Sequence, residues 1–518
     1  MSAGAGTIHG LAPPIERSDR FGINLLANVG NLGLTMVVGV LYVPFLVAHL
    51  GPDVYGLVPL MTMATSYMGL LTLALNSAMG RYLTIALGRQ DHAQANVIFN
   101  VGFWANLALA LLLVIPAVVA TVYVDHILRI PSGYESAARW LFAGTVAALL
   151  LNQVKTPFTA SPFSANRLEL ANLVYVGETL TRVGLVVCLF LMVSPRVEYI
   201  GIAILAGTVV STVGMIKLWK ILTPTLSIRI GEFDWKLLRE LCGTGWWVIV
   251  SQLGLMLYLN IDLLLANRLF GAEQSGRYAV VLQLPMLLRA GCIAVGGIFP
   301  PTMYRLYARG ETDELVTFLN NAIKFLGLVM ALAIGLVCGF SEPLLRLWLG
   351  PSFSNLAPLL FLMAIHLCLS LSMYPLWAVP LAANRMRLQG LVALGVGVGN
   401  LLLGLLLAQA FGWGLYGLAA AGAIMLTIRY VVFAPLYAAR VLNVSYGTFF
   451  RALMPILLAT LTTIAACRFI LWRWGISSWF ELGTAAFAVS LAFAASVFVL
   501  LTPTERLALR DAARRGRR

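Results

Sequence analysis

The stretch YVPFLVAHLGPDVYGLVPL, residues 42–60, is the most informative part of the chain because its pattern returns about 220 residues later, again between two apolar segments. In the first copy, Leu50-Gly51 is followed after three residues by Tyr55-Gly56. In the second copy, Phe270-Gly271 is followed after three residues by Ser275-Gly276. Chance is the alternative explanation, since glycine and tyrosine are common at the ends of membrane helices. Two matches with the same spacing favour a duplicated helical hairpin.

A second hairpin, one apolar span further along the chain, is also repeated. Its recurring positions are Tyr82, Ala86, Gly88 and Asp91 in the first copy and Tyr304, Ala308, Gly310 and Asp313 in the second. Six predicted spans separate the copies, an even number, so both copies run through the bilayer in the same direction. Duplicated six-helix halves with a path between them are how many secondary transporters are built.

The composition is that of an integral membrane protein. Of the 518 residues, 60% are hydrophobic and 11% are charged, and the mean hydropathy is +0.89. A soluble domain of this composition would have too little polar surface to stay in solution. An outer-membrane barrel is excluded because its strands are short and alternating, whereas the apolar runs here are long. We predict an all-α polytopic membrane protein with about 14 transmembrane helices, since a span needs roughly 20 apolar residues. The predicted spans lie near 22–48, 57–80, 97–124, 140–160, 170–193, 199–222, 242–267, 278–301, 321–341, 357–380, 388–410, 414–438, 452–472 and 479–501.

These spans divide the chain into two pseudo-symmetric six-helix bundles plus two C-terminal helices. The expected segments are a cytoplasmic N-terminal tail (1–20), an N-terminal six-helix bundle (21–222), a cytoplasmic amphipathic linker (223–241), a C-terminal six-helix bundle (242–440), two additional transmembrane helices (441–501) and a basic cytoplasmic tail (502–518).

The distribution of basic residues predicts the orientation of the chain. An even number of spans puts both termini on one side, and that side holds 23 Lys and Arg residues against 8 on the other. By the positive-inside rule we expect both termini to be cytoplasmic. The net charge of +14 could also suggest a nucleic acid partner. Beside a membrane helix, however, a basic tail is better explained by attraction to anionic membrane lipids, and we expect no nucleic acid partner.

Several classes of chemistry are not supported by any motif. The predicted loops are too short to form a soluble domain, and the chain contains neither a phosphate-binding G-x-x-x-x-G-K-[ST] loop nor an H-E-x-x-H sequence. None of the six cysteines is spaced as C-x-x-C. We therefore expect a protein that is not an enzyme, without catalytic residues, metal or cofactor.

Two predicted spans carry polar stripes. Asn24, Asn28, Asn31 and Thr35 share one face of span one, and Thr62, Thr65, Gly69, Thr72 and Asn76 share one face of span two. Polar stripes are unfavourable against lipid, so they should face other helices or a wet cavity. Hydrogen bonding between helices remains the alternative. We favour a substrate cavity lined by Asn24, Asn28, Asn31 and Asn76.

The repeat extends this cavity to the second half. A shift of 220 residues maps Asn31 onto Ser251 and Gly69 onto Arg289, so we predict that Ser251 and Arg289 also line it. An arginine at mid-depth costs about 3 kcal/mol unless water or an anion receives it. Arg289 is therefore the first candidate to bind an anionic substrate, and a structural pair with a carboxylate is the alternative.

Other ionisable residues leave more than one interpretation open. Glu178 and Arg182 lie one turn apart in span five and could neutralise each other; Arg182 is also a cavity candidate and Glu178 a possible ion-coupling acid. Asp262 is either a second possible ion-coupling acid or an interfacial residue. Three bases near span ends, Lys155, Lys324 and Arg429, could extend to the cytoplasmic surface or line the cavity. Bases outnumber acids at depth, which favours phosphorylated or acidic cargo over cationic drugs.

Four stretches carry a resemblance to a known family. The hairpin at 42–60, GRYLTIALGRQD (80–91), YLNIDLLLANRLFGAEQSGRYAVVLQL (258–284) and EPLLRLWLG (342–350) resemble the O-antigen and exopolysaccharide flippases. These belong to the multidrug/oligosaccharidyl-lipid/polysaccharide exporter superfamily. The resemblance covers nearly the whole chain, although its motifs are soft and include no invariant catalytic residue.

The resemblance implies a fold, a cargo and a location. It implies two six-helix bundles in a V shape, alternating access, and an undecaprenyl-diphosphate-linked oligosaccharide moved across the bacterial inner membrane. A polysaccharide polymerase and export machinery would be partners. Arg289 matches the position of inward-facing arginines in related lipid II flippases. A proton- or sodium-coupled multidrug exporter is the alternative, which the asparagines in span one disfavour. A membrane-embedded polymerase or transferase is a third option, disfavoured by the short loops.

Overall fold

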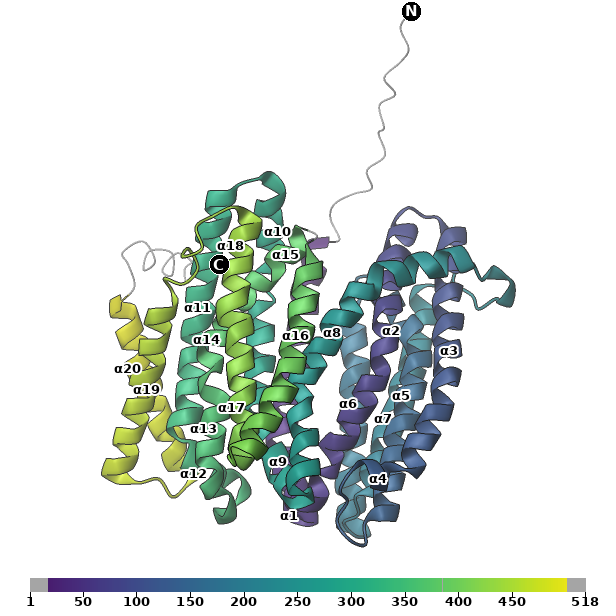
Figure 1. Cartoon of the computed structure of the whole chain (residues 1–518). Helices are drawn as coiled ribbons and strands as arrows, with labels where there is room; N and C mark the ends of the chain where they lie inside the picture. The colour runs from purple at the N-terminus through teal and green to yellow at the C-terminus, as the bar shows by residue number, and fades with distance from the viewer. Residues whose placement is uncertain (1–16, 384, 501–518) are drawn as a thin grey trace, which may run out of the picture.

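The computed structural model describes residues 17–383 and 385–500, which are helical almost throughout (Figure 1). The first half contains α1 (Arg17–Tyr55), α2 (Leu57–Gly88), α3 (His92–Val122), α4 (Val124–Ile127), α5 (Glu135–Ser164), α6 (Leu168–Met192), α7 (Glu198–Leu222) and the short η2 (Ile230–Glu232). No β-strand occurs in the described residues, and the predicted all-α class is confirmed. Most of the two predicted tails, residues 1–16 and 502–518, lies outside the described residues.

The second half is more broken. It contains α8 (Trp235–Phe270), α9 (Ala272–Gly296), α10 (Pro300–Arg309), α11 (Thr312–Gly339), α12 (Ser341–Leu349), η3 (Pro351–Leu356), α13 (Ala357–Ile365), α14 (Leu367–Ser372), η4 (Tyr374–Trp377), α15 (Ala378–Ala382), α16 (Met386–Leu405), η5 (Leu406–Ala410), α17 (Gly414–Thr427), η6 (Ile428–Phe433), α18 (Ala434–Leu442), α19 (Leu453–Trp474) and α20 (Trp479–Leu500). Two of the breaks occur at prolines, which cannot continue a helix without losing a hydrogen bond: Pro300 begins α10, and Pro375 lies in η4 between α14 and α15.

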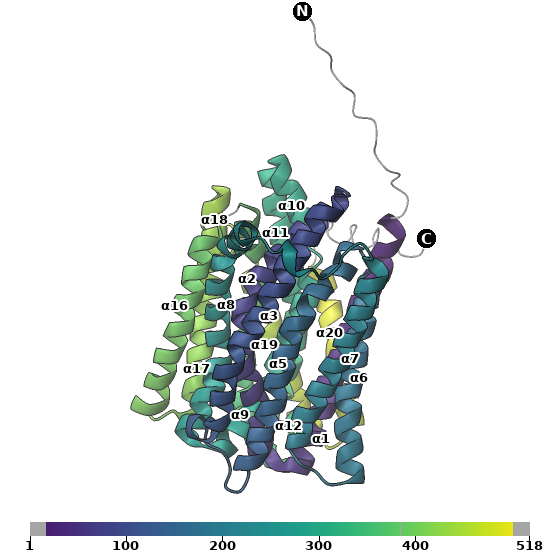
Figure 2. The same ribbon diagram turned by 90° about the vertical axis from the view of Figure 1, so that its right-hand side faces the viewer.

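The number of spans agrees with the prediction. Within the described residues, 13 helices are long and apolar enough to cross a membrane. The 32-residue α2 completes the set, because it runs the same height of the molecule beside α3 and α5 (Figures 1 and 2). Many apolar side chains on the outer helices are exposed, such as Leu112, Met192 and Phe480, as expected for surfaces that contact lipid.

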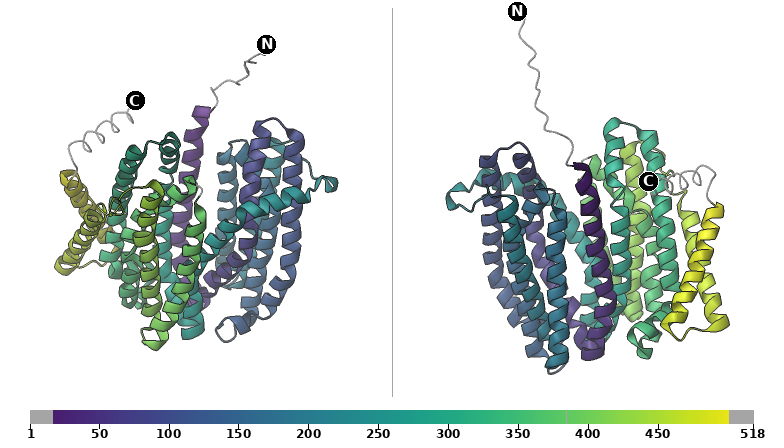
Figure 3. Two further views of the ribbon diagram at one scale, coloured as in Figure 1. Left: turned by 45° about the horizontal axis from the view of Figure 1, so that its top comes forward. Right: turned by 180° about the vertical axis from the view of Figure 1, so that it is seen from behind.

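The helices group into two bundles that meet at one face and diverge toward the other (Figure 1). One bundle contains α2, α3 and α5 to α7, and the other contains α9 to α18. The long helices α1 and α8 lie between them: α1 packs on α6 and α9, and α8 packs on α2 and α16 (Figure 3). The last pair, α19 and α20, packs on α11, far from the first bundle. The described chain begins and ends near the wider face.

The segment predicted as a linker, 223–241, is divided between a stretch that precedes α8 and the first residues of α8. Residues from Trp235 onward belong to α8 itself, which Asp234 caps by accepting a hydrogen bond from the Lys236 backbone N–H at 2.7 Å. The preceding residues run along α3, where the buried Asn100 accepts from the Arg229 N–H at 2.7 Å and donates to the Ser227 carbonyl at 2.8 Å. The linker is therefore bound to the first bundle through backbone hydrogen bonds.

Candidate functional site: a closed hairpin face and two polar interiors

The two repeated hairpins lie at the face where the bundles meet, which we call the hairpin face. Gly51 interrupts α1 with φ 78°, and Gly271 links α8 to α9 with φ 90°. Both angles lie in the region that side chains with a Cβ rarely adopt. The first glycine of each copy is therefore required by the turn.

The second glycine of each copy has a different role, since the two hairpins contact each other through these residues. A Cβ placed on Gly56 would lie 2.7 Å from the Gly276 Cα, and a Cβ on Gly276 would lie 1.8 Å from the Pro52 carbonyl oxygen. Only a residue without a side chain permits this approach of two backbones. The repeat that identifies the fold in sequence is thus the contact that closes the hairpin face.

Hydrogen bonds reinforce this closure. The buried side chain of Asn267, at the end of α8, accepts from the Arg129 backbone N–H at 2.8 Å and donates to the Arg129 carbonyl at 3.0 Å. The Trp348 indole donates to the Val40 carbonyl at 2.6 Å. Both contacts join the first half of the chain to the second, so these hydrogen bonds stabilise the contact between the halves at this face.

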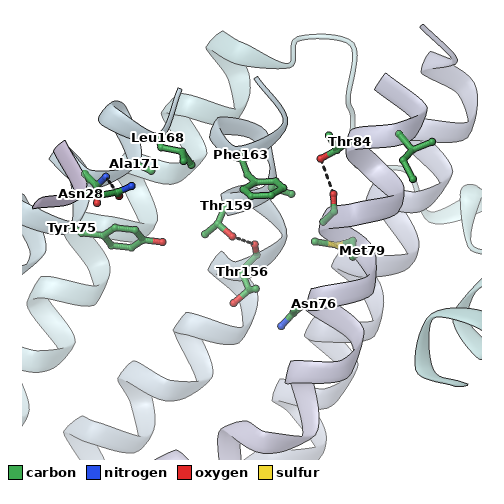
Figure 4. Close-up of a pocket in the computed structure, with 14 residues that line it drawn as sticks. Asn28, Asn76, Met79, Thr84, Thr156, Thr159, Phe163, Leu168, Ala171 and Tyr175 are labelled. Atoms are coloured by element: carbon green, nitrogen blue, oxygen red, sulfur yellow. Dashed lines mark hydrogen bonds between the residues drawn. The ribbon is translucent and has the colours of Figure 1, made fainter. Parts of the chain in front are cut away.

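A pocket with a mixed polar and apolar wall lies inside the first bundle, between α1, α2, α5 and α6 (Figure 4). Its volume is about 670 Å³. No charged residue lines it; its walls consist of Asn28, Asn76, Met79, Gly80, Thr84, Ile85, Thr156, Thr159, Ala160, Phe163, Leu168, Ala171, Asn172 and Tyr175. We call this space the N-bundle pocket. Two of the predicted cavity residues, Asn28 and Asn76, are in its wall.

The other asparagines of α1 hold that helix against α6. Asn24 is buried; its amide nitrogen donates to the Asn166 carbonyl at 3.2 Å, and its oxygen accepts from the Glu169 N–H at 3.1 Å. Asn31 donates to the Asn172 side chain at 3.2 Å, which donates in turn to Asn28 at 2.7 Å. Asn24 and Asn31 thus make hydrogen bonds between helices, and neither is in the wall of the N-bundle pocket. In the second half, Ser251 is half-buried on α8.

The carboxylate of Glu178 pairs with a base other than the predicted one. It lies 3.5 Å from the Nζ of Lys155 on α5, and that Nζ also donates to the Ser211 hydroxyl at 2.9 Å. The side chain of Lys155 is only 5% exposed, so it does not reach the membrane surface. Arg182 makes no ion pair with Glu178 within the described residues, and its Nε is buried without a hydrogen-bond partner.

We predict that the Lys155–Glu178 pair is structural. Glu178→Gln leaves a buried ammonium without its counter-charge, which should cost about 3 kcal/mol of stability and lower the melting temperature in detergent. The double variant Lys155→Met/Glu178→Gln should recover most of the loss and retain transport. Thr181→Val, one turn away, is the control. A double variant that is stable but inactive would instead make Glu178 an ion-coupling acid.

The second bundle encloses a charged polar cluster. Asp262 on α8 is buried and accepts hydrogen bonds from the Asn400 amide at 2.8 Å and the Tyr278 hydroxyl at 3.4 Å. No base forms an ion pair with it within the described residues. Asp262 is therefore an interior residue rather than an interfacial one, and it keeps its place as a candidate for ion coupling.

Two guanidinium groups accompany this carboxylate. Arg289 on α9 shares a narrow interior space with Asp262 and His366, and no carboxylate lies within ion-pair distance of it in the described chain. Arg429 is buried, with its guanidinium carbon 4.9 Å from the Tyr258 ring centroid and one terminal nitrogen unpartnered. Tyr258 in turn hydrogen-bonds Tyr430 at 2.8 Å. Two interior cations and one anion therefore lie around α8, α9 and η6.

For two of these bases the sequence leaves two roles open, and two threonines of the pocket wall were not among the predicted site residues. Lys155 and Arg429 lie near span ends, where extension to the surface is as common as burial; the π-helical turn at Ile428–Phe433 carries Arg429 inward. Thr156 and Thr159 follow Asn152 with the same spacing as Asn24, Asn28 and Asn31 in α1, so helical periodicity places them on one face. The described residues contain no group of three or more metal-ligating side chains.

Comparison with known proteins identifies the family and the fold. The model of a family described as polysaccharide biosynthesis protein matches residues 22–307. The chain is 33% identical over 486 residues to EpsK, an uncharacterized membrane protein of Bacillus subtilis, covering 94% of this chain and 96% of that protein.

Two solved structures show the same fold. The lipid II flippase MurJ in an inward closed conformation superposes with a TM-score of 0.64 at 12% identity, covering 92% of this chain and 98% of that one. An inward-facing multidrug resistance MATE family transporter of the MOP superfamily gives 0.63 at 16% identity, covering 85% and 99%. These matches show that the chain belongs to the polysaccharide biosynthesis protein family and has the fold of the MOP superfamily transporters.

Proposed function

We propose that this protein is a flippase that moves an undecaprenyl-diphosphate-linked oligosaccharide, such as an O-antigen or exopolysaccharide repeat unit, across the bacterial inner membrane by alternating access. The head group enters between the bundles from the cytoplasm while the polyprenyl chain stays in lipid. Separation of the hairpin face, with approach of the bundles at the opposite face, then delivers the head group outside. The cargo is not covalently changed.

The observation that carries this proposal is the excess of positive charge inside the second bundle. The interior contains two guanidinium groups, Arg289 and Arg429, and one carboxylate, Asp262. Neither arginine has an ion-pair partner in the described chain. Guanidinium groups bind phosphate oxygens through charge and bidentate hydrogen bonds. A diphosphate supplies the anion that these groups otherwise lack. A cationic drug, in contrast, would meet the same charges as repulsion.

The proposed orientation puts the wider face, and with it both termini, in the cytoplasm. Basic residues are concentrated there by the positive-inside rule, for example Lys217, Lys220 and Arg440 at helix ends. The hairpin face is then extracytoplasmic, and its closed contact supports a state that receives cargo from the cytoplasmic side. A polysaccharide polymerase and export machinery would receive the cargo on the other side.

The proposal predicts the outcome of deleting the gene. Oligosaccharide-lipid should accumulate on the cytoplasmic leaflet, because it is still synthesised but no longer moved, and surface polysaccharide should be lost. Mass spectrometry of extracted polyprenyl lipids measures the accumulation and identifies the glycan. Protection of that glycan from a glycosidase added to spheroplasts identifies the leaflet. Re-expression of the intact chain is the control and should reverse both effects.

The opposite result would overturn the proposal. If no oligosaccharide-lipid accumulates and surface glycans are intact, the protein does not flip this cargo. A proton- or sodium-coupled multidrug exporter would then be the better assignment, and the buried, unpaired carboxylate of Asp262 is the observation that favours it. Drug-susceptibility profiles of the same deletion strain would test that second candidate.

A further inference from the structure

We propose that the N-bundle pocket is a sugar-binding subsite, which takes one or two neutral sugar residues of the cargo while the interior cations of the second bundle take its diphosphate. This inference rests on the proposed function and adds to it a division of the cargo between the bundles. It assigns a ligand to the N-bundle pocket, for which binding of the diphosphate in the second bundle gives no role.

The chemistry of the pocket wall fits neutral sugars. Its lining combines amides and hydroxyls with the aromatic rings of Phe163 and Tyr175, and includes no ionisable acid or base other than the phenol of Tyr175. Sugar rings present several hydroxyls at their edges and apolar C–H faces, so they need both kinds of wall. A phosphate or an acidic sugar would lack a cation here. A polyprenyl chain would bury the pocket's polar groups without hydrogen bonds, which is costly.

The polar groups of the wall keep hydrogen-bonding capacity for a ligand. The hydroxyls of Thr156 and Thr159 donate only to carbonyls of their own helix, at 2.7 Å each, and so leave their oxygen lone pairs as acceptors. The amide oxygens of Asn28 and Asn76 accept from Asn172 at 2.7 Å and Asn106 at 2.9 Å, which directs their NH₂ groups away from those partners. In Figure 4 the nitrogen of Asn76 and the hydroxyl of Tyr175 point into the open space.

The wall is also held in place before any ligand arrives. Asn172 uses both ends of its side chain, donating to Asn28 and accepting from Asn31, and thereby fixes the Asn28 amide. Lys155 has its Nζ 5.8 Å from the Tyr175 ring centroid but is paired with Glu178, so this pair brings no net charge. Preorganised polar groups reduce the ordering cost of binding. The volume of about 670 Å³ lies within the range of roughly 300–1,000 Å³ for small-molecule pockets.

Binding to the purified full-length protein in nanodiscs tests this division. Three probes separate the contributions: undecaprenyl diphosphate, the same lipid carrying an N-acetylhexosamine, and a polyprenyl glucoside that has no phosphate. The variant Thr156→Val/Thr159→Val/Tyr175→Phe removes three hydroxyls without changing the shape of the pocket. It should weaken binding of the two sugar-bearing probes about tenfold or more, because each neutral hydrogen bond contributes roughly 1 kcal/mol. Binding of undecaprenyl diphosphate should not change.

The controls distinguish failure of this inference from failure of the proposed function. Thr181→Val, outside the pocket on α6, should bind all three probes like the wild type. An unchanged triple variant, an equal loss for all three probes, or a wild type that binds neither sugar-bearing probe would each overturn the sugar subsite. If instead the wild type fails to bind undecaprenyl diphosphate but the triple variant loses the glucoside, the pocket stands and the diphosphate cargo is wrong.

Discussion

Replacing Gly276 by alanine should abolish transport while leaving the protein in the membrane at normal abundance. The new Cβ would lie 1.8 Å from the Pro52 carbonyl oxygen and 2.5 Å from its carbon. Both are backbone atoms of the other hairpin and cannot rotate away, so the hairpin face must open. Overpacking of this kind costs about 3 kcal/mol, which corresponds to roughly a hundredfold loss of the closed state.

Distances between the bundles measure this effect directly. Spin labels at the exposed Glu135 and Glu273, which begin or nearly begin α5 and α9 at the hairpin face, should move apart in Gly276→Ala. Gly395→Ala is the matched control, because a Cβ there has no atom within 4 Å; its distances and transport should equal those of the wild type. A Gly276→Ala protein with unchanged distances and full transport would show that this contact does not control the hairpin face.

Arg289→Ala should reduce transport tenfold or more without lowering abundance. Arg289 is half-buried beside Asp262 and His366, and no carboxylate in the described chain neutralises it. A hydrogen bond to a charged group contributes about 1.5–3 kcal/mol, or roughly 10- to 150-fold in binding. Arg289→Lys should retain part of the activity, since a lysine keeps the charge but loses the planar fork that binds two phosphate oxygens.

Surface polysaccharide and inner-leaflet oligosaccharide-lipid in the complemented deletion strain measure the outcome. Arg305→Ala is the control, because Arg305 is exposed on α10 and its NH₂ group lies 3.4 Å from the Thr302 hydroxyl. If Arg289→Ala restores wild-type polysaccharide at normal abundance, Arg289 does not contact the cargo. If Arg289→Ala fails but Arg289→Ala/Asp262→Asn succeeds, the two side chains balance each other's charge and the role of Arg289 is structural.

The first prediction concerns closure of the hairpin face, and the second concerns binding of the cargo by Arg289. In the proposed transport cycle, the hairpin face closes by backbone contact at Gly56 and Gly276 when cargo is loaded, and the same contact breaks for release. No side chain at these positions can reach across and hold the face shut. A contact without interlocking side chains is well suited to repeated opening, while Asn267 and Trp348 supply the hydrogen bonds that select the closed position.

Much of the architecture follows from the sequence alone. The apolar runs predict the spans because each backbone polar group must be satisfied inside a helix in the bilayer. The hairpin spacing predicts the duplication, and Gly51 and Gly271 have the positive φ angles that a tight turn demands. The spans and the turns are local features. Each depends on residues that are neighbours in the sequence and on their preference for lipid or water, so the sequence alone predicts them.

The roles of individual polar residues were decided only by the tertiary structure. Helical periodicity placed Asn24, Asn28 and Asn31 on one face but could not say that α6 would cover Asn24 and Asn31 and leave Asn28 in the pocket wall. Likewise, the one-turn spacing of Glu178 and Arg182 suggested an ion pair within one helix, whereas the partner of Glu178 is Lys155 on α5. Periodicity determines which residues share a face. What packs against that face depends on contacts between helices far apart in the sequence, and these exist only once the bundle has formed.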